Sequence, residues 1–391
     1  MTAHRNIRLL GWFNFCNDFR IYGPVMVVYF AHVTGSYADG VLILAIAKIA
    51  SSVFEVPTGV FSDAIGRKAT MLAGQLANVL CIAAYAMAPS FALLAVGAVL
   101  EGLSFSLFSG NDDAFLYDTL KDENLEAEFP EYQGRLSAMF QWALALAAAV
   151  GALVLLWFPF RMLFWLSLAP QIAGLFVGLF TVEPKRHGRE IESNLFAHLR
   201  EAVAGFARDW KLRDVGIASI LGFALGEAKH MFYPAFFATL WPTWGLGVAG
   251  GLTHALAAVG FRASGTIVRR FRELPVLLWA NATSLAIGIT ATAVPTAASP
   301  ALSSASSLCF GPSVVSQGHL MQQAFTDRQR ATMGSLVSLG GNLLYAVAVF
   351  ALGWFADRIG PRYALLIAEI LTISVTLLYW RLFGRDARER G

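Results

Sequence analysis

Long apolar runs joined by short polar connections make up most of the 391-residue chain. A hydrocarbon core of about 30 Å requires about 20 apolar residues per helix. Runs of that length predict twelve membrane-spanning helices, near residues 7–34, 38–61, 68–89, 91–117, 134–157, 160–182, 214–240, 245–268, 274–294, 298–325, 331–356 and 362–382. The pattern therefore predicts an all-α integral membrane protein.

A long charged connection after the sixth apolar run divides the chain in two. We expect an N-terminal six-helix bundle over residues 1–183, a cytoplasmic linker over 184–213 and a C-terminal six-helix bundle over 214–391. Apolar residues recur at helical spacing within the linker, at Leu195, Phe196, Leu199, Val203, Phe206 and Trp210. This spacing predicts an amphipathic helix that lies on the inner membrane surface or against the bundle.

The basic residues are distributed unevenly over the connections. If the N-terminus is cytoplasmic, all but six of the 29 Lys and Arg lie in cytoplasmic connections or at the chain ends. The exceptions are Arg161, Arg358 and Arg362 in outside connections and Arg20, Lys48 and Lys229 within apolar runs. Cytoplasmic loops of membrane proteins carry such an excess of Lys and Arg. Both termini are therefore predicted to be cytoplasmic.

Composition excludes several classes of function. Hydrophobic residues make up 57% of the chain and charged residues only 14%, against about a quarter charged in soluble domains. The three cysteines, Cys16, Cys81 and Cys309, fall singly in apolar runs, so no disulfide, metal site or cofactor is indicated. No phosphate-binding loop and no His-x-x-x-His pair occurs, which argues against an ATP-driven pump and against an enzyme. The net charge of +3 does not indicate a nucleic-acid partner.

The connection between the second and third apolar runs carries a recognisable motif. It reads Gly-x-x-x-Asp-x-x-Gly-Arg-Lys, with Gly59, Asp63, Gly66, Arg67 and Lys68 at its fixed positions. The motif resembles the signature loop of the major facilitator superfamily. That resemblance implies two pseudo-symmetric six-helix bundles around a central cavity, which work by alternating access as the bundles rock against each other.

The resemblance also implies roles for the residues of the loop. Asp63 would pair across the bundle interface and hold the outward-open state, while Arg67 and Lys68 face the cytoplasm. Glu55, about two turns earlier, is expected to brace this gate. Asp357 and Arg358 belong to a similar run between the eleventh and twelfth segments. An inverted repeat within each half would place such a run on the outer side of the membrane.

Two departures from the family pattern concern proton and drug antiporters. Ala98 occupies a position where the resemblance to proton-coupled members implies an arginine, and the acid Glu101 lies beside Gly102 instead. Gly151 in the fifth segment is not followed by proline. A further resemblance, at residues 109–118, is to a bacterial branch of the family, which implies location in the bacterial inner membrane.

Charged residues inside apolar runs are the candidate cavity residues. A charge at mid-membrane costs at least about 2.5 kcal/mol on insertion scales, so each one needs a partner or a function. The candidates for proton coupling or substrate binding are Asp18, Arg20, Glu101, Asp112, Asp113, Glu227, Lys229 and His230. Structural ion pairs between helices remain the alternative for the acid-x-base pairs, and helix-end solvation remains the alternative for Asp112 and Asp113.

These observations favour a secondary active transporter that exchanges a small-molecule substrate for protons across a lipid membrane. Export of an amphipathic drug, metabolite or siderophore, as in an antiporter, is the first hypothesis. Proton-coupled uptake of a small anion is the alternative, because Arg20 and Lys229 could bind one. A non-transporting membrane sensor or scaffold is a third hypothesis from a different class. The resemblance implies a monomer.

Overall fold

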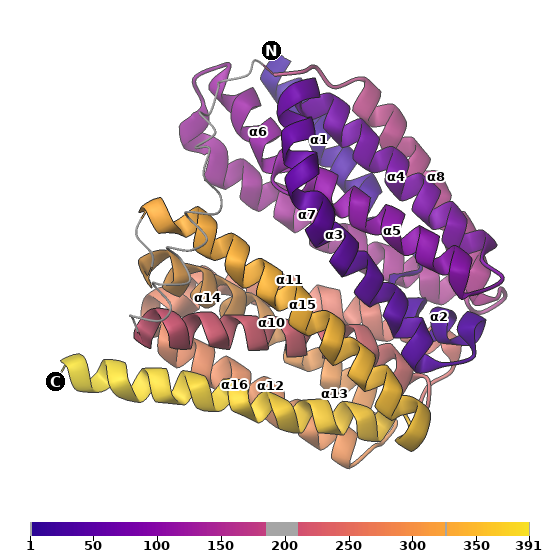
Figure 1. Cartoon of the computed structure of the whole chain (residues 1–391), viewed down its shortest axis with the longest axis vertical. Helices are drawn as coiled ribbons and strands as arrows, with labels where there is room; N and C mark the ends of the chain where they lie inside the picture. Colours follow the sequence, from indigo (N-terminus) through magenta and orange to yellow (C-terminus); the bar gives the residue numbers. More distant parts are fainter. Residues whose placement is uncertain (1, 185–209, 325–326, 391) are drawn as a thin grey trace. The chain divides into compact units, whose positions relative to one another are not determined.

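The computed structural model describes residues 2–184, 210–324 and 327–390, and all regular structure in these ranges is helical (Figure 1). The helices form two compact units. The first unit comprises Met1–Arg189 and Pro242–His254, and the second unit comprises Glu190–Trp241 and Ala255–Gly391. The predicted amphipathic linker helix lies outside the described residues, apart from Trp210 at the start of the following helix.

The first unit is formed by the N-terminal α-helices. They are α1 (Thr2–Asp18), α2 (Met26–Thr34), α3 (Tyr37–Ile65), α4 (Arg67–Met87), α5 (Phe91–Phe108), α6 (Asn111–Lys121), α7 (Phe129–Val154) and α8 (Phe160–Leu179). Helix α5 packs against both α3 and α4, and α4 also packs against α8. The first unit is therefore built around α4 and α5, which lie among the indigo-to-violet helices of Figure 1.

The second unit contains most of the remaining helices. They are α10 (Trp210–Phe237), α11 (Thr243–Phe271), α12 (Glu273–Ala293), α13 (Ser299–Ala305), α14 (Phe310–Ala324), α15 (Asp327–Ile359) and α16 (Pro361–Arg390). Residues Pro242–His254, which include the start of α11, group with the first unit. Helix α10 packs against α15 and α16, and α16 also packs against α12.

Three of the twelve predicted segments are interrupted. Segment 7–34 breaks after Asp18 and resumes through a short 3₁₀ turn at Gly23–Val25, where Pro24 supplies no N–H donor. Segment 91–117 breaks at Ser109 and Gly110, and Gly110 has φ +69°. Segment 298–325 contains a 3₁₀ turn at Ser306–Cys309. The expected helix lengths missed these breaks, although polar residues accompany two of them: Asp18 and Arg20 at the first, and Asp112 and Asp113 at the second.

The described part of the chain has nine helices that are long and apolar enough to cross a membrane. The predicted segments without such a helix are 7–34 and 298–325, which are interrupted, and 214–240, which corresponds to the charge-bearing α10. All twelve segments are nevertheless mainly helical where they are described. The prediction of an all-α membrane protein is confirmed.

Glycine allows α3 and α5 to approach closely. A Cβ atom added at Gly102 would lie 2.5 Å from the carbonyl oxygen of Ala47 and 2.7 Å from the backbone nitrogen of Ser51. Both atoms belong to the backbone of α3, which cannot move aside as a side chain can. Small residues at helix crossings give this kind of contact in membrane proteins. Gly102 is thus required for the packing of the first unit.

We expect Gly102→Ala to lower the free energy of unfolding by about 1–3 kcal/mol, the typical cost of overpacking. Gly226→Ala in α10 is the matched control, because a Cβ atom there would meet nothing within 4 Å. Thermal unfolding of the detergent-solubilised variants measures the difference. Equal melting temperatures for the two variants would contradict the assigned role of Gly102.

Candidate functional site

A buried carboxylate lies at the centre of the first unit. The side chain of Glu101 on α5 is 6% exposed. Its Oε2 accepts a hydrogen bond of 2.7 Å from the hydroxyl of Tyr85, and its Oε1 lies 3.8 Å from Nη1 of Arg20. Phe105, one turn further along α5, has Arg20 5.2 Å and Lys48 5.8 Å from its ring centre, within the range of cation–π attraction. Two cations thus lie at the Phe105 ring, and one of them, Arg20, also pairs with Glu101.

The break between α1 and α2 positions Arg20. Its Nε donates to the carbonyl oxygen of Asn17 at 3.2 Å. Buried amides from α4 and α8 satisfy the polar groups at the end of α1. Gln171 donates to the carbonyl oxygens of Cys16 (3.0 Å) and Asn17 (3.1 Å), and Asn78 donates to Oδ1 of Asn17 at 2.8 Å. Irregular backbone is tolerated at membrane depth only where protein groups satisfy it in this way.

The second unit holds a buried carboxylate with the same kinds of partner. Glu369 on α16 is fully buried, and its Oε2 lies 2.8 Å from Nζ of Lys229 on α10. Its Oε1 accepts a hydrogen bond of 2.6 Å from the hydroxyl of Tyr233. Gly288 on α12 provides the space, since a Cβ atom there would lie 2.5 Å from the carboxyl carbon of Glu369. Each unit therefore contains an acid, a cation and a tyrosine hydroxyl in contact.

The sequence analysis missed Glu369 and the amides of α4 and α8. Glu369 is a single acid inside the apolar run 362–382, so the cost of burying a charge was the signal that could have identified it. Gln75, Asn78 and Gln171 are buried polar residues in apolar runs. Burying a neutral amide costs less than burying a charge, so they stand out less clearly in the sequence. Their hydrogen-bond partners depend on which helices pack together, and this packing could not be predicted from the sequence.

The other predicted cavity residues are not among the described ion-pair partners of Glu101 or Glu369, although Asp18 is close enough to Arg20 for electrostatic attraction. Asp18 is half-buried at the end of α1, and Asp112 has a buried Oδ1 without a hydrogen-bond partner among the described residues. Asp113 is exposed and accepts from Gln133 at 3.2 Å. Glu227 is half-buried and His230 is exposed on α10, and neither is among the described contacts of Glu369.

The predicted gating loop forms a network centred on Arg67. Gly66 joins α3 to α4 with φ +106°, a conformation that suits glycine. The Arg67 guanidinium donates to the Ser62 hydroxyl at 2.9 Å, lies 3.4 Å from Oδ1 of Asp63, and lies 3.8 Å from Oδ2 of Asp118 on α6. Asp63 thus has a partner within its own unit. The pairing of Asp63 across the two bundles stays a prediction.

A carboxylate beyond α8 caps the start of α4. Glu183 accepts hydrogen bonds from the backbone N–H groups of Arg67 (2.7 Å) and Lys68 (2.8 Å). A negative charge is favourable at this helix end, where N–H groups lack partners. The Lys68 ammonium in turn donates to the carbonyl oxygens of Leu179 (2.8 Å) and Thr181 (2.6 Å) at the end of α8. The start of α4 and the end of α8 therefore each supply a charged side chain that binds the free backbone groups of the other helix.

The remaining residues that were predicted to form the gate are exposed. Glu55 and Gly59 lie on exposed positions of α3. In the similar run before α16, Arg358 stacks 3.5 Å above the ring of Trp354, and Asp357 is also exposed. Arg362 donates to the carbonyl oxygens of Thr292 (2.9 Å) and Ala293 (2.7 Å) at the end of α12. Arg362 therefore joins α16 to α12 as Lys68 joins α4 to α8.

Comparison with known proteins identifies the family. The model of the Major Facilitator Superfamily matches residues 9–344. An uncharacterised transporter of this type from Bacillus subtilis (strain 168), YxaM, is 22% identical over 184 residues, which are 47% of this chain and 46% of that protein. The matched region thus spans about half the length of this relative. The chain belongs to the Major Facilitator Superfamily.

Solved structures agree with this family. A point mutant of the nucleoside transporter NupG superposes with a TM-score of 0.80 at 13% identity over 98% of this chain and 100% of that one. A bacterial homologue of the human lysosomal transporter Spinster superposes with a TM-score of 0.77 at 14% identity over 98% of both chains. The twelve-helix fold of two six-helix bundles is therefore confirmed, and the family consists of transporters rather than enzymes.

We expect Lys229→Met to destabilise the second unit by about 3–5 kcal/mol, because it leaves Glu369 buried without a counter-charge. The double variant Lys229→Met with Glu369→Gln should recover most of this loss, since the amide can still accept from Tyr233. Thermal unfolding of the two single variants and the double variant measures the coupling. Additive losses would contradict a direct ion pair.

Proposed function

We propose that this chain is a proton-coupled secondary active transporter that works by alternating access and exports a small amphipathic molecule. The observation that carries the proposal is the buried carboxylate in each unit, Glu101 and Glu369, held by a cation and a tyrosine hydroxyl. Family membership supports transport. The absence of a phosphate-binding loop from the sequence supports coupling to an ion gradient.

Protonation of a buried carboxylate would change its attraction to the neighbouring cation. A proton on Oε2 of Glu369 removes the negative charge that faces Lys229 at 2.8 Å, while Tyr233 can still donate to Oε1. Lys229 then lacks its counter-charge in a region of low dielectric, where an unpaired charge is costly. The protonated and ionised states would therefore favour different helix arrangements or different occupants beside Lys229. This dependence is what coupling of protons to transport requires.

The same reasoning applies to the first unit. Arg20 is held on one side by Glu101 and on the other by the carbonyl oxygen of Asn17. Asp18, Asp112 and Asp113 are assigned to a proton path near this break, and Glu227 and His230 to the corresponding region of α10. The buried Oδ1 of Asp112, which has no hydrogen-bond partner among the described residues, supports this assignment.

Aromatic side chains along α1 support an amphipathic solute. Trp12, Phe15 and Phe19 follow one another along α1 and the break after it, with ring centres 5.8 Å and 5.7 Å apart. Trp12 is 53% exposed. A row of rings along the helix that precedes Arg20 suits a molecule with one apolar and one polar end.

Uptake of a small anion by proton symport is the second candidate function. Arg20 and Lys229 each face a buried acid, so protonation of that acid would leave a cation to receive an anionic solute. The direction of proton movement relative to the solute separates the two candidates. The protein is proposed to act as a monomer in the bacterial inner membrane with both termini cytoplasmic, which the basic cytoplasmic connections support.

We expect Glu101→Gln and Glu369→Gln each to abolish solute accumulation driven by a pH gradient while solute binding persists. Candidate solutes are screened in proteoliposomes with a pH-sensitive dye inside, and binding is measured separately by isothermal titration calorimetry. Glu131→Gln is the control, since this exposed residue pairs at the surface with Arg135. Full pH-driven transport by both buried-acid variants would overturn the proposal.

We expect Asp63→Asn to slow the transport cycle and to leave the dissociation constant for the solute unchanged. Asp63 lies 3.4 Å from Arg67 in the predicted gating loop, whereas the described partners of Glu101 are Tyr85 and Arg20. Initial rates in proteoliposomes and equilibrium binding in detergent separate the two effects. A large loss of affinity would contradict a gating role.

A further inference from the structure

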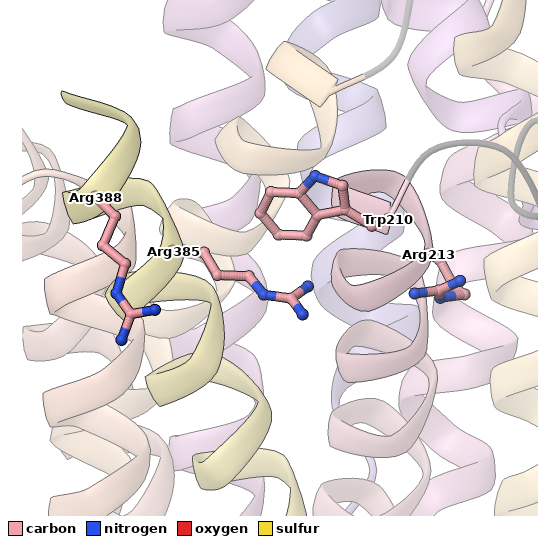
Figure 2. A pocket seen from close by; sticks show the side chains of 4 residues that line it. All are labelled: Trp210, Arg213, Arg385 and Arg388. Atoms are coloured by element: carbon pink, nitrogen blue, oxygen red, sulfur yellow. The ribbon is translucent and has the colours of Figure 1, made fainter.

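A basic pocket lies where the first turn of α10 meets the last turns of α16. Trp210, Arg213, Arg385 and Arg388 line it, and its volume is about 440 Å³. Figure 2 shows the Arg385 side chain extending toward the indole of Trp210, with Arg388 and Arg213 on either side. The Arg385 guanidinium carbon lies 4.7 Å from the centre of the indole ring. The pocket belongs entirely to the second unit.

One buried carboxylate orders the arginines around the pocket. Asp214 has a side chain that is 6% exposed, and its oxygens lie 3.6 Å from Arg213, 3.7 Å from Arg381 and 3.3 Å from Arg385. Arg388 adds a further guanidinium to the wall. One carboxylate neutralises one unit of charge, so the cluster of these five residues retains an excess of positive charge. Asp386, an acid next to Arg385 on α16, is not among the lining residues.

The pocket lies at the depth of lipid headgroups. The apolar span of α16 runs from Pro361 to Asp386, so Arg385 and Arg388 are at its end. Trp380, one turn earlier, is 62% exposed. Tryptophan concentrates at the membrane–water boundary, and arginine-rich connections lie on the cytoplasmic side. With the C-terminus on the cytoplasmic side, as the distribution of basic residues predicts, both features favour a position of the pocket beside the inner leaflet.

We propose that this pocket binds the phosphate group of an anionic phospholipid of the inner leaflet. Arginine binds phosphate through paired N–H donors, and Arg385 and Arg388 supply two such groups with Asp214 holding Arg385 in place. Basic pockets between membrane helices on the cytoplasmic side bind anionic headgroups on the same physical basis. The indole of Trp210 provides an apolar wall for the glycerol region. The proposal does not depend on the direction or coupling of transport.

Phosphatidylglycerol titration of the purified full chain in detergent, followed by thermal unfolding, tests the proposal. Phosphatidylcholine serves as the zwitterionic control lipid and inorganic phosphate as the free-anion control. We expect phosphatidylglycerol to raise the melting temperature of the wild type more than either control does. Arg388→Gln and the double variant Arg385→Gln with Arg388→Gln should weaken phosphatidylglycerol binding by roughly fivefold per arginine removed.

Arg135→Gln is the matched control variant, because Arg135 is an exposed arginine of the first unit that pairs with Glu131. It should bind phosphatidylglycerol as the wild type does. Arg388→Gln leaves the three ion pairs of Asp214 intact, so we expect this variant to fold even if the double variant does not. Unchanged phosphatidylglycerol binding by both pocket variants would overturn the proposal. Equal stabilisation by inorganic phosphate would also overturn it, in favour of a site for a soluble anion.

Discussion

The hydrocarbon core contains no water, so every polar group at membrane depth has to find its partner within the protein. The two buried acids show how strongly this constrains the helices. Glu101 is held by Tyr85 and Arg20, and Glu369 by Tyr233 and Lys229. Removing one partner leaves a charge whose burial costs several kcal/mol. The positions of the helices that carry these residues are therefore linked to the state of the acids.

Close packing provides the space that these acids need. Gly288 leaves room for the carboxyl group of Glu369, and Gly97 leaves room for the ring of Tyr85, since a Cβ atom there would lie 2.6 Å from it. Gly102 lets α5 approach the backbone of α3 beside Glu101. Small residues in membrane helices thus do more than allow helix contact. They decide where a buried charge and its partner can be accommodated.

Helix ends form a second set of links within each unit. Lys68 at the start of α4 binds carbonyl oxygens at the end of α8, and Arg161 at the start of α8 donates to the carbonyl oxygen of Ala88 at the end of α4, at 2.9 Å. Arg362 makes the same kind of link between α16 and α12. Free carbonyl groups at a helix end attract cations. These bonds therefore link the positions of the two helices in each pair.

The helical fold, the twelve apolar segments, the resemblance to the family and the place of the Gly59–Lys68 motif could be predicted from the sequence, because hydrophobic length and a short motif are local properties. The sequence also pointed to Arg20, Glu101 and Lys229, since a charge in an apolar run is visible without a structure. It did not reveal the breaks at Pro24 and Gly110, the partner Glu369 or the cap Glu183. The last two depend on contacts between residues far apart in the chain, as in the separation of 140 positions between Lys229 and Glu369. Only the tertiary structure decides such contacts, because helix packing selects which residues meet.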